Sequence, residues 1–86
     1  MARQIENQDY AKMLKRMVVS AGRRFADSDP DDLQFLMEVR DLLDEQIAAT
    51  VHGLNASGYS LDQIAKPMGI ARQNLHRKYF AKKKVA

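Results

Sequence analysis

Apolar residues recur at intervals of three and four positions along most of this chain, which is the spacing of residues on one face of a helix. In the first segment this pattern predicts one helix from about Asn7 to Phe25. We expect the helix to be weakened near Gly22, because glycine costs about 1 kcal/mol against alanine in a helix interior. The apolar positions, which we expect to pack as core, are Tyr10, Met13, Leu14, Met17, Val18, Ala21 and Phe25.

A second apolar stripe predicts a long helix from Pro30 to about Ser57. Asp29 can cap its start, and proline suits the first helical position because an N–H there has no intrahelical partner. Gly58 offers a C-cap at the other end, and we expect the last turns to pack behind the elements that follow. The stripe comprises Leu33, Leu36, Met37, Val39, Leu43, Ile47, Val51 and Leu54.

Residues 60–80, SLDQIAKPMGIARQNLHRKYF, predict two short helices joined by a tight turn. Ser60 and Gln63 have the spacing of a capping box, which fixes the start of the first short helix. Gly69 can adopt a positive φ without steric cost, so we expect that helix to end near Met68. The residues expected to face inward are Leu61, Ile64, Ala65, Met68, Ile70, Ala71, Leu75 and Tyr79.

The opposite face of the second short helix carries side chains that can read DNA bases. Arginine can pair bidentately with guanine in the major groove, and glutamine can do the same with adenine. The second helix of a helix-turn-helix enters the groove with its N-terminal residues leading, so Arg72 and Gln73 are the expected base contacts. An ordinary solvated helix face is the alternative interpretation. The expected DNA-binding residues are Ser60, Arg72, Gln73, Asn74, His76, Arg77, Lys78, Lys82, Lys83 and Lys84.

The run from Gly58 to Phe80 resembles the helix-turn-helix of sigma-factor region 4 and of small actinobacterial and phage regulators. The resemblance covers roughly a quarter of the chain and implies that the second short helix reads the major groove. It also implies a compact repressor from a phage, plasmid or mobile element. The matching residues are Gly58, Tyr59, Ser60, Ile64, Ala65, Gly69, Ile70, Arg72, Gln73, Arg77 and Tyr79.

The net charge of +3 conceals a strong segregation along the chain. Residues 1–26 carry a net +4, residues 27–59 a net −7 and residues 60–86 a net +6. A concentration of basic charge over the predicted helix-turn-helix is typical of nucleic-acid binding. The lysines at 82–84 extend this basic segment, although such a tail can also serve only solubility. The basic first helix is expected to pair with the acidic second helix of its own chain or of a partner.

Composition limits the function classes that this chain can serve. Its 86 residues suffice for one small domain, and the absence of cysteine excludes disulfides and thiolate chemistry. The two histidines, His52 and His76, do not have a metal-ligand spacing. We therefore expect no enzyme activity, no cofactor, no metal and no small-molecule ligand. The chain has no apolar run of about 20 residues, so we expect a cytoplasmic protein without a membrane partner.

The sequence thus predicts an all-α protein in which two longer helices are followed by a C-terminal helix-turn-helix. We expect residues 1–58 to form a helical dimerisation and support region, 59–81 the helix-turn-helix and 82–86 a basic tail. The expected partners are double-stranded DNA and a second copy bound through residues 7–57. The favoured function is a sequence-specific transcriptional repressor. The alternatives are a nonspecific architectural DNA binder and a protein-interaction module that docks on RNA polymerase, a sigma factor or another regulator.

Overall fold

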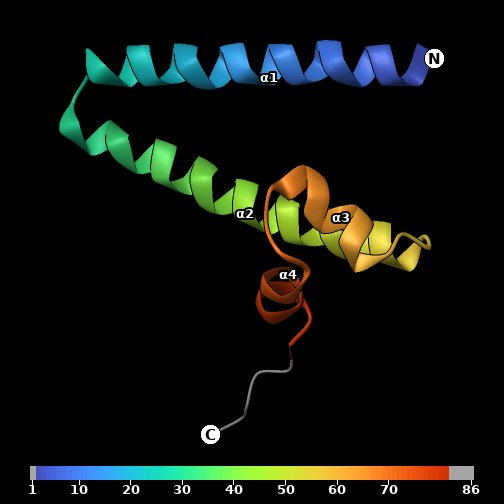
Figure 1. Ribbon diagram of the computed structural model, residues 1–86. Helices are drawn as coiled ribbons and strands as arrows, with labels where there is room; N and C mark the ends of the chain where they lie inside the picture. Colours follow the sequence, from blue (N-terminus) through green and yellow to red (C-terminus); the bar gives the residue numbers. More distant parts are fainter. Residues whose placement is uncertain (1, 82–86) are drawn as a thin grey trace, which may run out of the picture. The chain divides into compact units, whose positions relative to one another are not determined.

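A computed structural model describes residues 2–81, with side chains from residue 6 onward. These residues form four α-helices and one short 3-10 helix, and they contain no strand (Figure 1). The prediction of an all-α protein is therefore confirmed. The chain divides into two compact units, Met1–Asp41 and Leu42–Ala86, and the division falls inside one continuous helix, α2 (Leu33–Ala56).

The first unit begins with the long helix α1 (Ala2–Ala26). This helix starts earlier than the predicted Asn7 and continues without a break through Gly22. The glycine penalty of about 1 kcal/mol is small against the hydrogen bonds of a 25-residue helix, so it does not interrupt the helix. The apolar stripe predicted as core is instead exposed at most positions within this unit, including Tyr10, Met13 and Met17.

The turn after α1 corrects the predicted start of the second long helix. Residues Pro30–Asp32 form the 3-10 helix η1, and α2 begins only at Leu33. The Asp32 N–H donates to the Asp29 carbonyl at 2.9 Å, an i to i+3 bond that tightens this first turn. Asp29 caps the turn as predicted, because its carboxylate accepts from the Asp31 N–H at 3.1 Å. The rings of Phe25 and Phe35 lie 5.8 Å apart between their centroids and pack the two sides of the turn together.

The second unit packs two short helices, α3 (Leu61–Met68) and α4 (Arg72–Tyr79), against the last turns of α2. In Figure 1 α3 is seen from the side while α4 is seen nearly end-on, so the two helices run in very different directions. The prediction that the end of α2 supports these helices is confirmed. The buried core residues are Val51, Ile64, Ala65 and Leu75, surrounded by the partly buried Ile47, Leu61, Met68, Ile70, Tyr79 and Phe80.

Both turns of the second unit are closed by the same glycine-dependent motif. Gly58 has φ +110° and Gly69 has φ +71°, conformations that other residues rarely adopt. After α2 the Tyr59 N–H donates to the Leu54 carbonyl at 3.1 Å, and the Gly58 N–H donates to Asn55 at 3.0 Å. This pair of bonds is a Schellman motif, and α3 ends with the equivalent bonds at Gly69. The predicted C-cap roles of both glycines are therefore confirmed.

The start of α3 is fixed by the predicted capping box. The Gln63 N–H donates to the Ser60 hydroxyl at 3.1 Å, and the Ser60 N–H donates to the side-chain carbonyl of Gln63 at 2.8 Å. Two backbone donors that an isolated helix end leaves unpaired are thus satisfied reciprocally. The hydroxyl oxygen of Ser60 is consequently engaged within the protein.

Replacement of Leu75 with alanine should destabilise the second unit more than any equivalent change at the surface. Leu75 is 0% exposed, and truncation of a buried leucine typically costs about 2–5 kcal/mol. The free energy of unfolding, measured by chemical denaturation, should fall by about that amount. Leu42→Ala is the matched control because Leu42 is 55% exposed, and an equal loss in the two variants would contradict the assigned core.

Candidate nucleic-acid interface

The outward face of α4 brings three of the predicted DNA-binding residues together. Arg72, Gln73 and His76 line one shallow depression, and Leu61 of α3 forms its fourth wall. All three α4 side chains are exposed, and Arg77 is exposed one position beyond them. Residues three and four positions apart share a helix face, so Arg77 lies beside Gln73 at the edge of this group. We call Arg72, Gln73, His76 and Arg77 the α4 face.

The arginines and the glutamine of the α4 face have free hydrogen-bonding capacity. Within the side chains that the structure describes, no hydrogen bond or ion pair engages Arg72, Gln73 or Arg77. A guanidinium group offers five donors, and a side-chain amide offers two donors and one acceptor oxygen. The face therefore presents donors and acceptors that match base edges and phosphate oxygens.

Other predicted DNA-binding residues lie apart from this face. Helical spacing places Asn74 and Lys78 together on a neighbouring strip of α4, and the Lys78 ammonium lies 5.5 Å from the centroid of the Tyr79 ring. Ser60 is occupied by the capping box. The lysines at 82–84 lie outside the described residues.

An aromatic contact that the sequence interpretation missed joins the end of α4 to α2. The rings of His52 and Phe80 lie 4.6 Å apart, and the rings of His76 and Phe80 lie 6.4 Å apart with an interplanar angle of 22°. No structural role was predicted for His52, but this exposed residue of α2 contacts Phe80, which follows α4. The four-residue interval between His76 and Phe80 is the only sequence signal of this contact. His76 is thus exposed and lies near the Phe80 ring.

The N-terminal end of α4 lacks a side-chain cap. Ala71 occupies the N-cap position with φ −73° and ψ 148°, and its methyl group accepts no hydrogen bond. The Leu75 N–H donates to the Ala71 carbonyl at 3.0 Å and begins the helical bonding. The N–H groups of the first turn, which belongs to Arg72, Gln73 and Asn74, therefore remain available to an external acceptor such as a phosphate oxygen.

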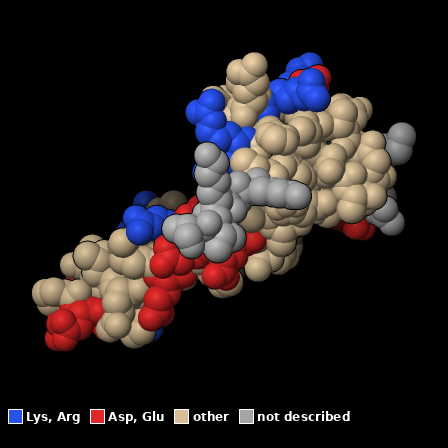
Figure 2. Space-filling model, turned by 90° about the horizontal axis from the view of Figure 1, so that it is seen from below, with Lys and Arg blue, Asp and Glu red and all other residues tan. Residues whose placement is uncertain are grey.

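Charge is distributed unevenly over the second unit. The described charged residues of α3 are Asp62 and Lys66, and those of α4 are Arg72, Arg77 and Lys78, whereas Asp44 and Glu45 lie on α2. Figure 2 shows several groups of Lys and Arg side chains, one of which borders Asp and Glu side chains and another of which includes an acidic side chain. The net positive charge of α4 favours binding of a polyanion at this helix.

Two further features of the described residues bear on ligand classes. No three or more His, Asp or Glu residues among them lie close enough to hold a metal ion. None of their helices combines the length and apolar character needed to cross a bilayer.

Comparison with known proteins gives no relative from which chemistry can be transferred. No protein-family model, no curated protein and no solved structure matches this chain. The chemistry of the α4 face therefore has to be judged from its own side chains and their geometry.

Replacement of Ala71 with serine should stabilise the second unit. The backbone at this position already has the extended conformation of an N-cap, so a serine hydroxyl can accept from the uncapped first turn of α4. The free energy of unfolding should rise by about 0.5–2 kcal/mol in a denaturant titration. Ala81→Ser, at an exposed position after α4, should leave it unchanged. No gain at residue 71 would mean that the first turn of α4 is already satisfied.

Proposed function

We propose that α3 and α4 form a helix-turn-helix with which this protein binds double-stranded DNA as a sequence-specific transcriptional regulator. In this proposal α4 is the reading helix and enters the major groove with its N-terminal end leading. Arg72 and Gln73 contact base edges, and His76 and Arg77 contact bases or phosphates one turn further on. Repression by occupancy of a promoter is the simplest mode of action for so small a regulator.

The observation that carries the proposal is the convergence of Arg72, Gln73 and His76 on one exposed depression at the leading end of α4. These side chains are held on a helix whose inward residue, Leu75, is fully buried, so the helix presents them from a fixed support. An ordinary solvent-exposed helix face does not need an arginine next to a glutamine, because any polar side chains would keep it hydrated. Both side chains have the geometry to distinguish purines in the major groove.

The uncapped first turn of α4 supports the same proposal. A phosphate oxygen at the helix N-terminus can accept from the free N–H groups and is favoured by the helix dipole. Contacts of this kind carry no sequence information, but they fix the register of the protein on the duplex. The basic residues of segment 60–86 add sequence-independent attraction to DNA.

We further propose that the regulator acts as a homodimer. One short reading helix contacts only a few base pairs, and two-fold symmetry doubles the contact. Many apolar side chains of α1 and α2 are exposed within their own units, which supplies surface for association; examples are Tyr10, Met17, Val39 and Leu43. The resemblance to small phage and actinobacterial regulators is part of this proposal and supports a role in the regulation of transcription.

Selection of bound fragments from random duplex DNA at a stated salt concentration tests the proposal directly. A sequence-specific dimer should recover an inverted repeat whose half-site centres are about 34 Å, or a multiple of this distance, apart. An architectural binder should retain DNA without enriching a motif. A protein-interaction module should retain no DNA.

Arg72→Ala and Gln73→Ala should each weaken binding to the selected site by about 1–3 kcal/mol and binding to random DNA much less. The reason is that a lost base contact removes discrimination, whereas a lost phosphate contact weakens all DNAs alike. Fluorescence anisotropy with both duplexes measures the difference. Asn74→Ala is the matched control because Asn74 is polar and exposed but lies on the neighbouring strip of α4. Unchanged discrimination in the double variant would remove α4 as the reading helix.

Deletion of Lys82, Lys83 and Lys84 should flatten the salt dependence of DNA affinity without changing the preferred sequence. Each phosphate contact that is lost reduces the slope of log K against log salt by about 0.9. A variant with alanine at Lys12, Lys15 and Arg16 removes the same number of positive charges from α1 and should leave the slope nearly unchanged. Equal slopes for the tail deletion and the intact protein would show that the tail does not touch DNA.

A further inference from the structure

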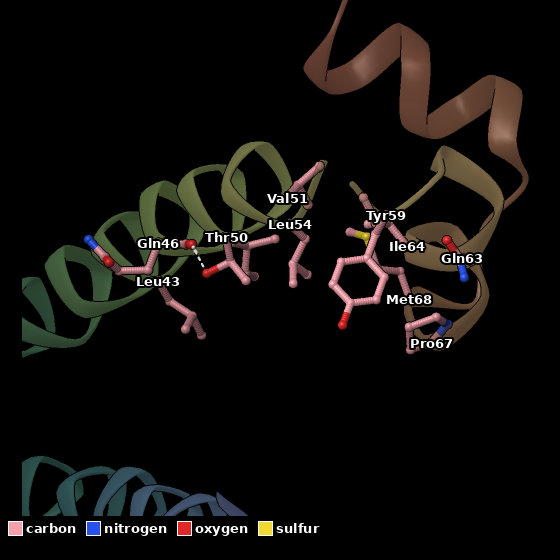
Figure 3. A pocket seen from close by; sticks show the side chains of 11 residues that line it. Leu43, Gln46, Thr50, Val51, Leu54, Tyr59, Gln63, Ile64, Pro67 and Met68 are labelled. Atoms are coloured by element: carbon pink, nitrogen blue, oxygen red, sulfur yellow. Dashed lines mark hydrogen bonds between the residues drawn. The ribbon is translucent and has the colours of Figure 1, made fainter. Parts of the chain in front are cut away.

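An open groove of about 420 Å³ runs between the C-terminal part of α2 and α3, within the second unit. Figure 3 shows Leu43, Thr50 and Leu54 along one side of this groove and Ile64, Pro67 and Met68 along the other, with the Tyr59 ring between them. We call it the α2–α3 groove. None of its eleven lining residues belongs to α4.

The α2–α3 groove is apolar and carries no charge. None of its lining residues is Lys, Arg, Asp, Glu or His, although 29% of the whole chain is charged. Its large apolar side chains nevertheless face water, since Leu43 is 55%, Tyr59 51% and Leu54 39% exposed. Removal of such adjoining surfaces from water is favourable, so a partner surface is expected to cover them.

We infer that the α2–α3 groove binds a second copy of this chain. In this dimer the α2–α3 grooves of the two copies face each other across a two-fold axis. In such an interface every residue near the axis meets its own equivalent, so a charged residue there would meet a like charge. A groove without charges meets this condition. Its polar members, Gln46, Thr50 and Gln63, have groups that both donate and accept, so they can bond to their own copies.

The absence of charged residues in the groove also disfavours other binding partners. A nucleic acid needs cations to neutralise its phosphates, and the groove provides none. A strongly charged peptide would find no opposite charge there. A second copy would present an equally uncharged and apolar surface to the groove. The acidic residues Asp44 and Glu45 of α2 are not among the lining residues.

This inference rests on the homodimer of the proposed function and supplies the place where the two copies meet. The groove and the α4 face share no residue, since the groove draws on residues between Leu43 and Met68, and the α4 face begins at Arg72. Association through the groove would therefore leave both reading helices free to bind DNA. The two surfaces can also be disabled separately.

The test compares Leu43→Glu with Leu42→Glu in the full-length protein. The two leucines are neighbours on α2 and are equally exposed at 55%, but only Leu43 lines the groove. Sedimentation equilibrium should show a dimer for the unchanged protein and for Leu42→Glu. For Leu43→Glu the dimer dissociation constant should rise on the order of a hundredfold, because a carboxylate would be buried without a partner. Circular dichroism should show equal helicity in both variants.

Cross-linking then tests the two-fold arrangement. The chain has no cysteine, so single replacements Gln46→Cys, Thr50→Cys and Leu54→Cys introduce one thiol at successive turns of α2 along the groove. At least one of these should be cross-linked to its own copy by a short bismaleimide. Glu45→Cys, on the same helix but outside the groove, should not be.

The inference is overturned if the unchanged protein is monomeric at micromolar concentration, or if Leu42→Glu dissociates the dimer as strongly as Leu43→Glu. It is also overturned if none of the three groove cysteines is cross-linked, because another segment of the chain would then fill the groove. A monomer that still selects one DNA motif would leave the proposed function intact. A groove-linked dimer without DNA preference would support the inference and contradict the proposed function, and Arg72→Ala should leave the dimer unchanged in either case.

Discussion

Leu75 lies in one buried cluster with Val51 of α2 and with Ile64 and Ala65 of α3, and the position of α4 depends on this contact. The helix has only eight residues, which is too short for a helix to be stable alone in water. Its stability and its orientation must therefore come from burial of its inward face. Every property that we assign to the outward face of α4 follows from the fact that Leu75 holds the helix in place.

Local hydrogen bonds are prominent in the second unit, beside its small core. A core of four buried residues is small, and the turns of this unit are closed by local hydrogen bonds: a capping box at Ser60 and Schellman motifs at Gly58 and Gly69. These bonds satisfy backbone groups near the turns and leave the outer side chains of α4 unengaged. Phe80, beside the rings of His52 and His76, adds an aromatic contact at the far end of α4. The unit can thus present polar side chains on one surface and an apolar groove on another.

Short-range signals in the sequence predicted short-range structure well. The capping box depends on residues three positions apart, and the two glycine turns depend on one residue each, so both could be recognised without knowledge of the fold. Helix ends were harder to predict where several local conformations compete. The second long helix was predicted to begin at Pro30, but residues Pro30–Asp32 form a 3-10 turn and α2 begins at Leu33. The first helix was predicted to begin at about Asn7, but α1 begins at Ala2.

By itself, the sequence determined the helical class, the positions of the turns and the residues on the outward face of α4, because a period of 3.6 residues and a few capping residues contain that information. Only the tertiary structure decided which of those residues meet. It placed Arg72, Gln73 and His76 beside Leu61, brought the Phe80 ring against His52, and left an uncharged groove along α2 and α3. These outcomes depend on contacts between helices, and such contacts are set by how side chains of distant segments fill space together.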